Sequence, residues 1–323
     1  RWVQDRLARR IATKRSPEIR RQYDAIGGRS PIVEATDRIA QALRDGIASV
    51  GQPVPVYVAH RYLPGDTARV VKQIVTDGVS ELLALPMYPH FSFATSGSSF
   101  EQLRDELARA EFTGTVQALR SYPDAAGYVQ ASAERLEATL AQDALRPAKT
   151  VLLCSAHGLP ASYVEQGDPY VQELNRSVDA LRRRFPQWRF VLSYQSRVGP
   201  AEWLRPYTDQ IIATFAAEGV QDVVFIPLAF VNDHIETLYE VGHTYFALVK
   251  QHGMTPHRVP AIEHHNAFIH MLTAAVLDWR SGFGTVPMAQ LLPPHQGGAR
   301  RDIWVWSAWL AALAWCLGFA IAH

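Results

Sequence analysis

Cysteine is scarce in this chain, and a surplus of either charge is missing. The only cysteines among 323 residues are Cys154 and Cys316, which lie far apart. This spacing excludes a disulfide scaffold, a four-cysteine zinc site and a four-cysteine iron–sulfur cluster. Lys and Arg total 32 against 31 for Asp and Glu, a net charge of +1, which gives no support to nucleic-acid binding. We therefore expect a reducing compartment, no cofactor and no nucleic-acid partner.

Glycine-rich nucleotide motifs are also missing. No Gly-x-Gly-x-x-Gly follows an apolar run, and no Walker-type loop occurs. What the chain does contain is an alternation of short β-branched runs with longer helix-like stretches, which is typical of parallel sheets covered by helices. The predicted strands are 54–58, 81–86, 115–120, 150–154, 190–194, 222–228 and, more weakly, 258–262. Because the pattern restarts after about residue 142, we predict an α/β fold with two similar doubly wound, Rossmann-like domains with parallel sheets.

The domain boundaries follow from the same pattern and from proline and glycine. The predicted units are an N-terminal α/β domain over 1–125, an inter-domain helix over 126–148, a C-terminal α/β domain over 149–284, a linker over 285–302 and a hydrophobic helix over 303–322. The chain opens without methionine, inside a stretch of 22 residues with eight basic and two acidic side chains. The first domain is therefore expected to lack its first strand.

The tail from Ile303 to Ala322 contains no charged residue and half of the eight tryptophans. Twenty helical residues span about 30 Å, the thickness of the bilayer hydrocarbon. Arg300 and Arg301 precede it, as basic residues do on the cytoplasmic side of a membrane helix. We expect a transmembrane helix that attaches a cytoplasmic enzyme to the inner membrane. The alternative is a buried helix of the globular core.

A histidine and a group of acidic residues follow two predicted strands, where α/β proteins bind their ligands. His157 comes after 150–154 in a turn with glycine and proline, and either bonds its own loop or faces the cleft. Asp233 and Glu236 follow 222–228 with the spacing of a capping box, which is the structural interpretation. Glu236 and Glu240 share a helix face, and carboxylates placed so usually line water or a cation path.

Aromatic and basic side chains follow the other predicted strands. They include Arg61, Tyr62, Tyr88 and Trp203. Rings and arginines suit a flat aromatic ligand that bears carboxylates. His and Glu also suit a divalent first-row metal ion.

At these positions the chain resembles the ferrochelatases, which insert Fe(II) into protoporphyrin IX. The matching blocks are Ser155–Pro160 with Gly167–Tyr170, Tyr194–Pro200 with Trp203-Leu204, Asp233–Leu238, Tyr88–Ser92 with Thr95–Ser99, and Lys14–Pro17 through Ile26–Pro31. Together they cover roughly residues 10–280. The resemblance implies a chelatase-type version of the two-domain fold, although the opening strand of the family is absent and His90 and Phe91 stand where Gln and Tyr are common.

The resemblance also implies roles for residues. His157 would accept a pyrrole proton or bind iron, with the role of base preferred, and Glu236 would hold the ion or relay protons. Both are thus expected to be catalytic and to contact the metal. The expected substrate-binding side chains are Arg15, Tyr23, Ser30, Arg61, Tyr62, Tyr88, Gln195, Ser196, Trp203, Asp233, His234 and Glu240.

The expected substrates are ferrous iron and protoporphyrin IX, with haem as product and two protons released. Three alternatives stay open. The first is the same chemistry on coproporphyrin III. The second is a cobalt or nickel chelatase, which would place more than one histidine on the metal, such as His234 or His90. The third is a membrane-tethered porphyrin carrier without catalysis, which would need no proton acceptor.

Overall fold

Two β-sheets organise the protein in the computed structural model, which describes residues 16–51, 53–279 and 284–291. The strands are β1 (Glu81–Ala84), β2 (Thr115–Leu119), β3 (Thr150–His157), β4 (Arg189–Gln195), β5 (Asp222–Ile226), β6 (Thr255–Arg258) and β7 (Thr285–Pro287). The first sheet has the order β1-β2-β7 and the second the order β4-β3-β5-β6. All neighbours in the second sheet are parallel, as are β1 and β2, whereas β7 runs antiparallel to β2. The predicted α/β fold with parallel sheets is confirmed.

Helices separate the strands. They are α2 (Ile32–Ser49), α3 (Asp66–Thr76), α4 (Ser98–Arg109), α5 (Ala126–Gln142), α6 (Ala161–Glu165), α7 (Tyr170–Arg184), α8 (Thr208–Ala217), α9 (Phe246–Gln251) and α10 (Asn266–Asp278). Two π-helical segments, η1 (Phe93–Gly97) and η3 (Glu236–Tyr245), and two 3-10 segments, η2 (Pro147–Lys149) and η5 (Met288–Leu291), complete the set. Residues 16–25 form one more helix.

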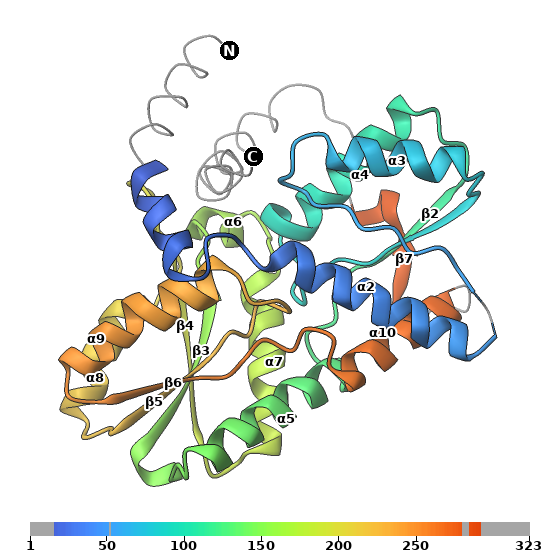
Figure 1. Ribbon diagram of the computed structural model, residues 1–323. Coiled ribbons are helices and arrows are strands. Elements are labelled where there is room, and N and C mark those ends of the chain that lie inside the picture. The colour runs from blue at the N-terminus through green and yellow to red at the C-terminus, as the bar shows by residue number, and fades with distance from the viewer. Residues whose placement is uncertain (1–15, 52, 280–283, 292–323) are drawn as a thin grey trace.

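The central strand β3 shows why the second sheet is apolar on both faces. Leu152 and Cys154 belong to the core cluster that α5 and α7 complete, and Val151 and Leu153 belong to the cluster of α8 and α9. Side chains alternate between the faces of a strand, so helices on both sides require an unbroken apolar run. Figure 1 shows α8 and α9 on one side of this sheet and α5 and α7 on the other. His157, the last residue of the strand, is the first with partial exposure.

The strand predicted at 54–58 is wrong. The segment is extended but joins no ladder in the described part of the chain. It shares with β1 a cavity of about 410 Å³, whose walls include Leu43 of α2, Ile74 of α3 and Leu82 of β1. The two backbones line this space together and do not meet, so β-branched composition alone does not produce a strand here.

The chain returns to the first sheet after the second is complete. Helix α10 packs with α2 and α5 in one core cluster, and β7 pairs with β2 through Val286 and Ala118. Residues 285–302 were predicted as a linker, but their first part is this strand followed by η5, with Met288 buried. Apolar side chains on α10 and at Met288 drive this return. The weak strand predicted at 258–262 forms earlier, as β6.

The hydrophobic tail 303–322 lies outside the described residues, so its assignment as a membrane helix stays a prediction. Across residues 16–51, 53–279 and 284–291, no helix is long and apolar enough to span a bilayer.

Candidate active site

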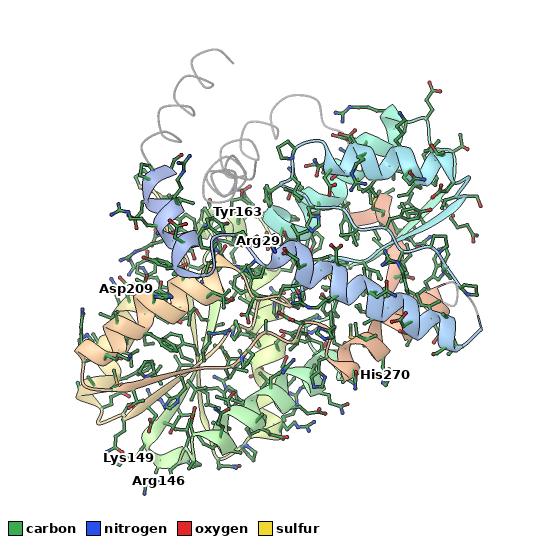
Figure 2. All side chains as sticks on the ribbon, in the orientation of Figure 1. Arg29, Arg146, Lys149, Tyr163, Asp209 and His270 are labelled. Carbon is green, nitrogen blue, oxygen red and sulfur yellow. The ribbon has the colours of Figure 1, made fainter. Side chains whose placement is uncertain are left out.

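The residues predicted to be reactive gather at the carboxyl end of the second sheet. Figure 2 shows Lys149, which precedes β3, at the opposite end of the sheet from Tyr163, which follows it on α6. In the ladder His157 lies opposite Gln195, at the ends of β3 and β4. Because parallel strands end at one edge, side chains from distant parts of the sequence meet there.

His157 and Glu236 form a hydrogen-bonded pair at this edge. Nδ1 of His157 lies 2.8 Å from Oε2 of Glu236. The side chains are 24% and 10% exposed, so the pair is largely shielded but reachable. A carboxylate beside Nδ1 accepts a hydrogen bond from Nδ1–H, so the lone pair of a neutral imidazole lies on Nε2. The arrangement is a proton acceptor with a negative charge behind it.

Opposing effects act on the pKa of His157. Burial alone would lower that pKa, because it disfavours the charged ring. The negative charge of Glu236, the hydrogen bond that its carboxylate accepts from His157 and the charge of Glu240 together outweigh burial, and the pKa of His157 is raised. The protein thus stabilises the imidazolium that forms when His157 accepts a proton.

His234 holds the start of the π-helix η3 and thereby places Glu236. Its Nδ1 accepts a hydrogen bond from the backbone N–H of Glu236 at 3.1 Å. The ring is buried against Phe230, and burial lowers the pKa of His234, so it stays neutral and able to accept. The predicted capping box is wrong, because Asp233 makes no cap bond to the helix. Its Oδ1 instead accepts hydrogen bonds from the Arg258 guanidinium at 2.6 Å and from the Thr237 hydroxyl at 2.7 Å.

Glu240 continues the polar path one turn along η3. Its carboxylate accepts hydrogen bonds from the backbone N–H of Ser196 at 2.9 Å, from the Ser196 hydroxyl, and from Gln195 Nε2 at 3.3 Å. The Tyr245 hydroxyl donates to it at 3.1 Å. Burial and the charge of Glu236 raise the pKa of Glu240. Three predicted residues, Gln195, Ser196 and Glu240, therefore form one network behind the pair.

Trp203 packs beside the histidine. The two rings meet edge to face with centroids 6.5 Å apart, and the Trp203 indole N–H donates to the Val198 carbonyl at 3.0 Å. Gly158 allows this approach, since a Cβ there would lie 2.9 Å from the Gln195 carbonyl oxygen and 3.2 Å from the Trp203 ring. The glycine after His157 is thus a packing requirement.

Tyrosine and arginine side chains from the part of the chain before β2 act on the same site. Burial and then the charge of Glu236 raise the pKa of Tyr23, which lies on the helix 16–25 above the second sheet. Burial also raises the pKa of Tyr88, where Tyr62, Arg61 and Glu236 all act electrostatically. The Arg61 guanidinium lies 5.2 Å from the Tyr62 ring centre. Tyr23 and Tyr88 are thus each within electrostatic reach of Glu236.

Ser30 and Arg15 remain of the predicted substrate-binding residues. Ser30 lies at the start of α2, where its hydroxyl accepts the Ile32 amide at 3.4 Å. Arg15 lies outside the described residues.

His90, weighed as a further metal ligand, has a structural role. It is buried, its Nε2 lies 2.7 Å from the Ser177 hydroxyl oxygen, and burial lowers its pKa to about 3. In the described ranges, no group of three or more His, Cys, Asp or Glu side chains could hold a metal ion.

Sequence reasoning missed three supporting residues. The Tyr170 hydroxyl donates to the His157 carbonyl at 3.1 Å, Tyr245 bonds Glu240, and the Ser155 hydroxyl bonds Gln195 Oε1. Strand alternation could have found Ser155, which is two residues from His157 on the same face. Tyr245 follows Glu240 by five residues, a spacing that matters only in a π-helix.

The sequence matches the family model "Ferrochelatase" over residues 1–278. Among curated proteins, the ferrochelatase of a Cyanothece strain is 38% identical over 97% of this chain and 82% of its own length. The ferrochelatase of a Synechococcus strain is 43% identical over 85% of this chain and 82% of its own. Among solved structures, Bacillus subtilis SirB with Fe3+ superposes with a TM-score of 0.56 at 12% identity, covering 77% of this chain and 93% of SirB, which shows a shared fold.

Proposed function

The chain belongs to the ferrochelatase family, and on this premise we propose that it inserts Fe(II) into protoporphyrin IX, forming haem and releasing two pyrrole protons. The observation that carries the proposal is the His157–Glu236 pair, 2.8 Å apart at the carboxyl end of β3 and partly exposed. A porphyrin carrier would need aromatic contacts but no such proton acceptor.

Removal of the pyrrole protons is assigned to His157. With Glu236 bonded to Nδ1, the neutral ring offers the Nε2 lone pair to a pyrrole N–H. The bond from nitrogen to hydrogen breaks, the porphyrin nitrogen keeps the electron pair, and the imidazolium that results faces a carboxylate. Because the pKa of His157 is raised by that carboxylate and by Glu240, proton acceptance is favoured.

Delivery of iron and export of protons are assigned to Glu236 and Glu240. Carboxylate oxygens bind a hydrated divalent cation and can replace its waters. Glu240 is held by Ser196 and Tyr245, so it offers a fixed second oxygen site four residues along the same helix. Each proton that leaves His157 can pass along the same carboxylates to solvent.

The porphyrin ring is assigned to the cleft between the pair and the first domain. Tyr62, Tyr88 and Trp203 supply ring faces and edges, and Arg61 supplies a cation for a propionate. The binding free energy of these contacts would offset the strain of a bent macrocycle. Asp233 is engaged by Arg258, so its contribution is to hold the turn before η3.

Anaerobic incubation with Fe(II) tests the function. Protoporphyrin IX and coproporphyrin III are offered separately, and the Soret band reports metallation of each. The proposal expects faster metallation of protoporphyrin IX. Faster metallation of coproporphyrin III would keep the proposed reaction but make coproporphyrin III the substrate. Binding of either porphyrin without metallation would support the alternative function of a porphyrin carrier.

The metallation rate should also depend on pH. It should fall as the pH drops through the pKa of His157, which lies above the ordinary histidine value of about 6.5. The pKa of His157 is raised, and a protonated ring has no lone pair, so lowering the pH through that pKa removes the base. The measurement is kcat/KM for porphyrin against pH. Glu240→Gln removes one of the charges that raise this pKa, so its acid limb should move to lower pH. An acid limb that stays in place in the variant contradicts the assignment.

We further propose that residues 303–322 attach the protein to a membrane, because this stretch carries no charge over twenty residues. The full chain should float with phospholipid vesicles in a density gradient, and a chain ending at residue 298 should not. Equal flotation of both would contradict the proposal, and loss of folding in the shorter chain would assign the tail to the core.

A further inference from the structure

Two buried carboxylates of the second domain hold the loop that follows β1. Asp168 and Glu173 are each 3% exposed. Asp168 Oδ2 accepts the Ser92 hydroxyl and the Phe93 amide, both at 2.8 Å. Glu173 Oε2 accepts the Phe91 amide at 2.6 Å. The loop that carries Tyr88 and the aromatic residues after it is therefore fastened across the domains.

Asp168 differs from Glu173 in what its other oxygen contacts. Asp168 Oδ1 accepts the backbone amide of Tyr170 at 2.9 Å, and the Tyr170 hydroxyl donates to the His157 carbonyl at 3.1 Å. Glu173 Oε1 instead receives Arg120 and Ser121, which follow β2 in the first domain. Asp168 thus links the loop to the strand of His157 through Tyr170, whereas Glu173 links the loop and the residues after β2 to α7.

We propose that Asp168 is a positioning residue that sets the aromatic loop 88–93 and His157 at a fixed separation, through Tyr170. The inference rests on the proposed function, because the porphyrin would lie between these two walls. A ring bound between walls that shift would keep its contacts but lose its alignment with the base. Misplacement by about 1 Å can lower a rate by about 10²-fold.

The chemistry of the contacts requires a carboxylate. All three groups that face Asp168 are used as donors: the Ser92 hydroxyl, the Phe93 amide and the Tyr170 amide. The Ser92 oxygen in turn accepts the Ala94 amide at the start of η1, which favours its proton pointing at Asp168. In Asp168→Asn, one oxygen becomes an NH₂ group. Whichever oxygen is replaced, the NH₂ group faces a backbone N–H, and two donors cannot form a hydrogen bond with each other. The shape of the side chain is kept while one side of the link is broken.

A double-mutant cycle on kcat separates positioning from general damage. Asp168→Asn should lower kcat by roughly tenfold or more, with a change in the porphyrin KM below about threefold. Tyr170→Phe, which removes only the hydroxyl that bonds His157, should lower kcat by a smaller factor. If both act through one link, the double variant should be about as slow as Asp168→Asn, because coupled residues are not additive. Multiplied effects would overturn the proposal.

Glu173→Gln is the matched control. It changes a carboxylate that is equally buried and holds the same loop, but whose hydrogen bonds go to Phe91, Arg120 and Ser121 instead of Tyr170. Combined with Tyr170→Phe, its effect on kcat should multiply. If Asp168→Asn does not fold, Ser92→Ala replaces it in the cycle, since it removes one donor to Asp168 and keeps the carboxylate.

Hydrogen exchange of the full chain tests the link without any turnover. Asp168→Asn should speed amide exchange both in residues 88–97 and in residues 155–160, whereas Glu173→Gln should speed it only in the former. Faster exchange confined to residues 88–97 in both variants would make Asp168 a local anchor and overturn the proposal. A wild-type chain that fails to metallate porphyrin would reject the proposed function, and the exchange experiment would still decide whether the link exists.

Discussion

Glu236→Gln is expected to retain its fold and porphyrin binding while losing iron insertion by about 10²-fold or more, the scale of a lost acid–base group. Glutamine keeps the shape, and its amide oxygen can still accept Nδ1–H of His157. The negative charge that raises the pKa of His157 disappears, and so does the oxygen that would hold Fe(II). The measurements are the metallation rate from the Soret band and the melting temperature.

The structure makes this comparison sharper than the sequence did. The helix start is held by His234 and not by a capping box, so the Glu236 side chain can be changed without removing a cap. Glu240→Gln is the control on the same helix, because its oxygens contact Ser196 and Tyr245 and leave the 2.8 Å pair intact. Its rate should fall less than that of Glu236→Gln. An unchanged rate in Glu236→Gln would remove this residue from the active site.

His157→Ala should bind porphyrin and metallate it at a negligible rate. The variant removes the Nε2 lone pair and the hydrogen bond to Glu236, while the aromatic side chains of the site remain. Loss of a general base typically costs 10²- to 10⁴-fold, so a fall within or beyond this range is expected. Porphyrin binding is read from quenching of tryptophan fluorescence, and metallation from the Soret band.

Two controls belong to this variant. Added imidazole should restore part of the rate, because the cavity left by the ring admits a small base. His252→Ala changes an exposed histidine after α9 and should leave the rate unchanged. A His157→Ala enzyme that metallates at the wild-type rate would refute the role of His157 as base, and imidazole without effect would favour the role of iron ligand.

Much of the site could be predicted because strand ends are visible in the sequence. His157 and Glu236 are 79 positions apart, yet each follows a short apolar run. Parallel strands carry such positions to one edge whatever the separation in sequence. The meeting of His157, Gln195 and Glu236 therefore follows from the order of strands alone.

The corrections arise where a long-range partner competes with a local rule. Asp233 has the spacing of a helix cap, but Arg258 of β6 binds its carboxylate, and a charge-assisted bond outweighs a bond to a backbone amide. The π-helix η3 has no signature in the hydrophobic pattern, so Tyr245 could not be placed. The segment 54–58 has the composition of a strand, but a strand needs a neighbour, which composition does not report.

The cavity beside β1 bears on how the protein behaves at high concentration. Among the described strands, β1 pairs only with β2, and its other side faces apolar walls. Before the segment 54–58 and the helices close this cavity during folding, the unpaired edge of β1 is a template to which a second extended polypeptide can add, and apolar walls favour that addition. Aggregation during refolding should therefore begin at this edge, and the protein that completes folding should keep full activity.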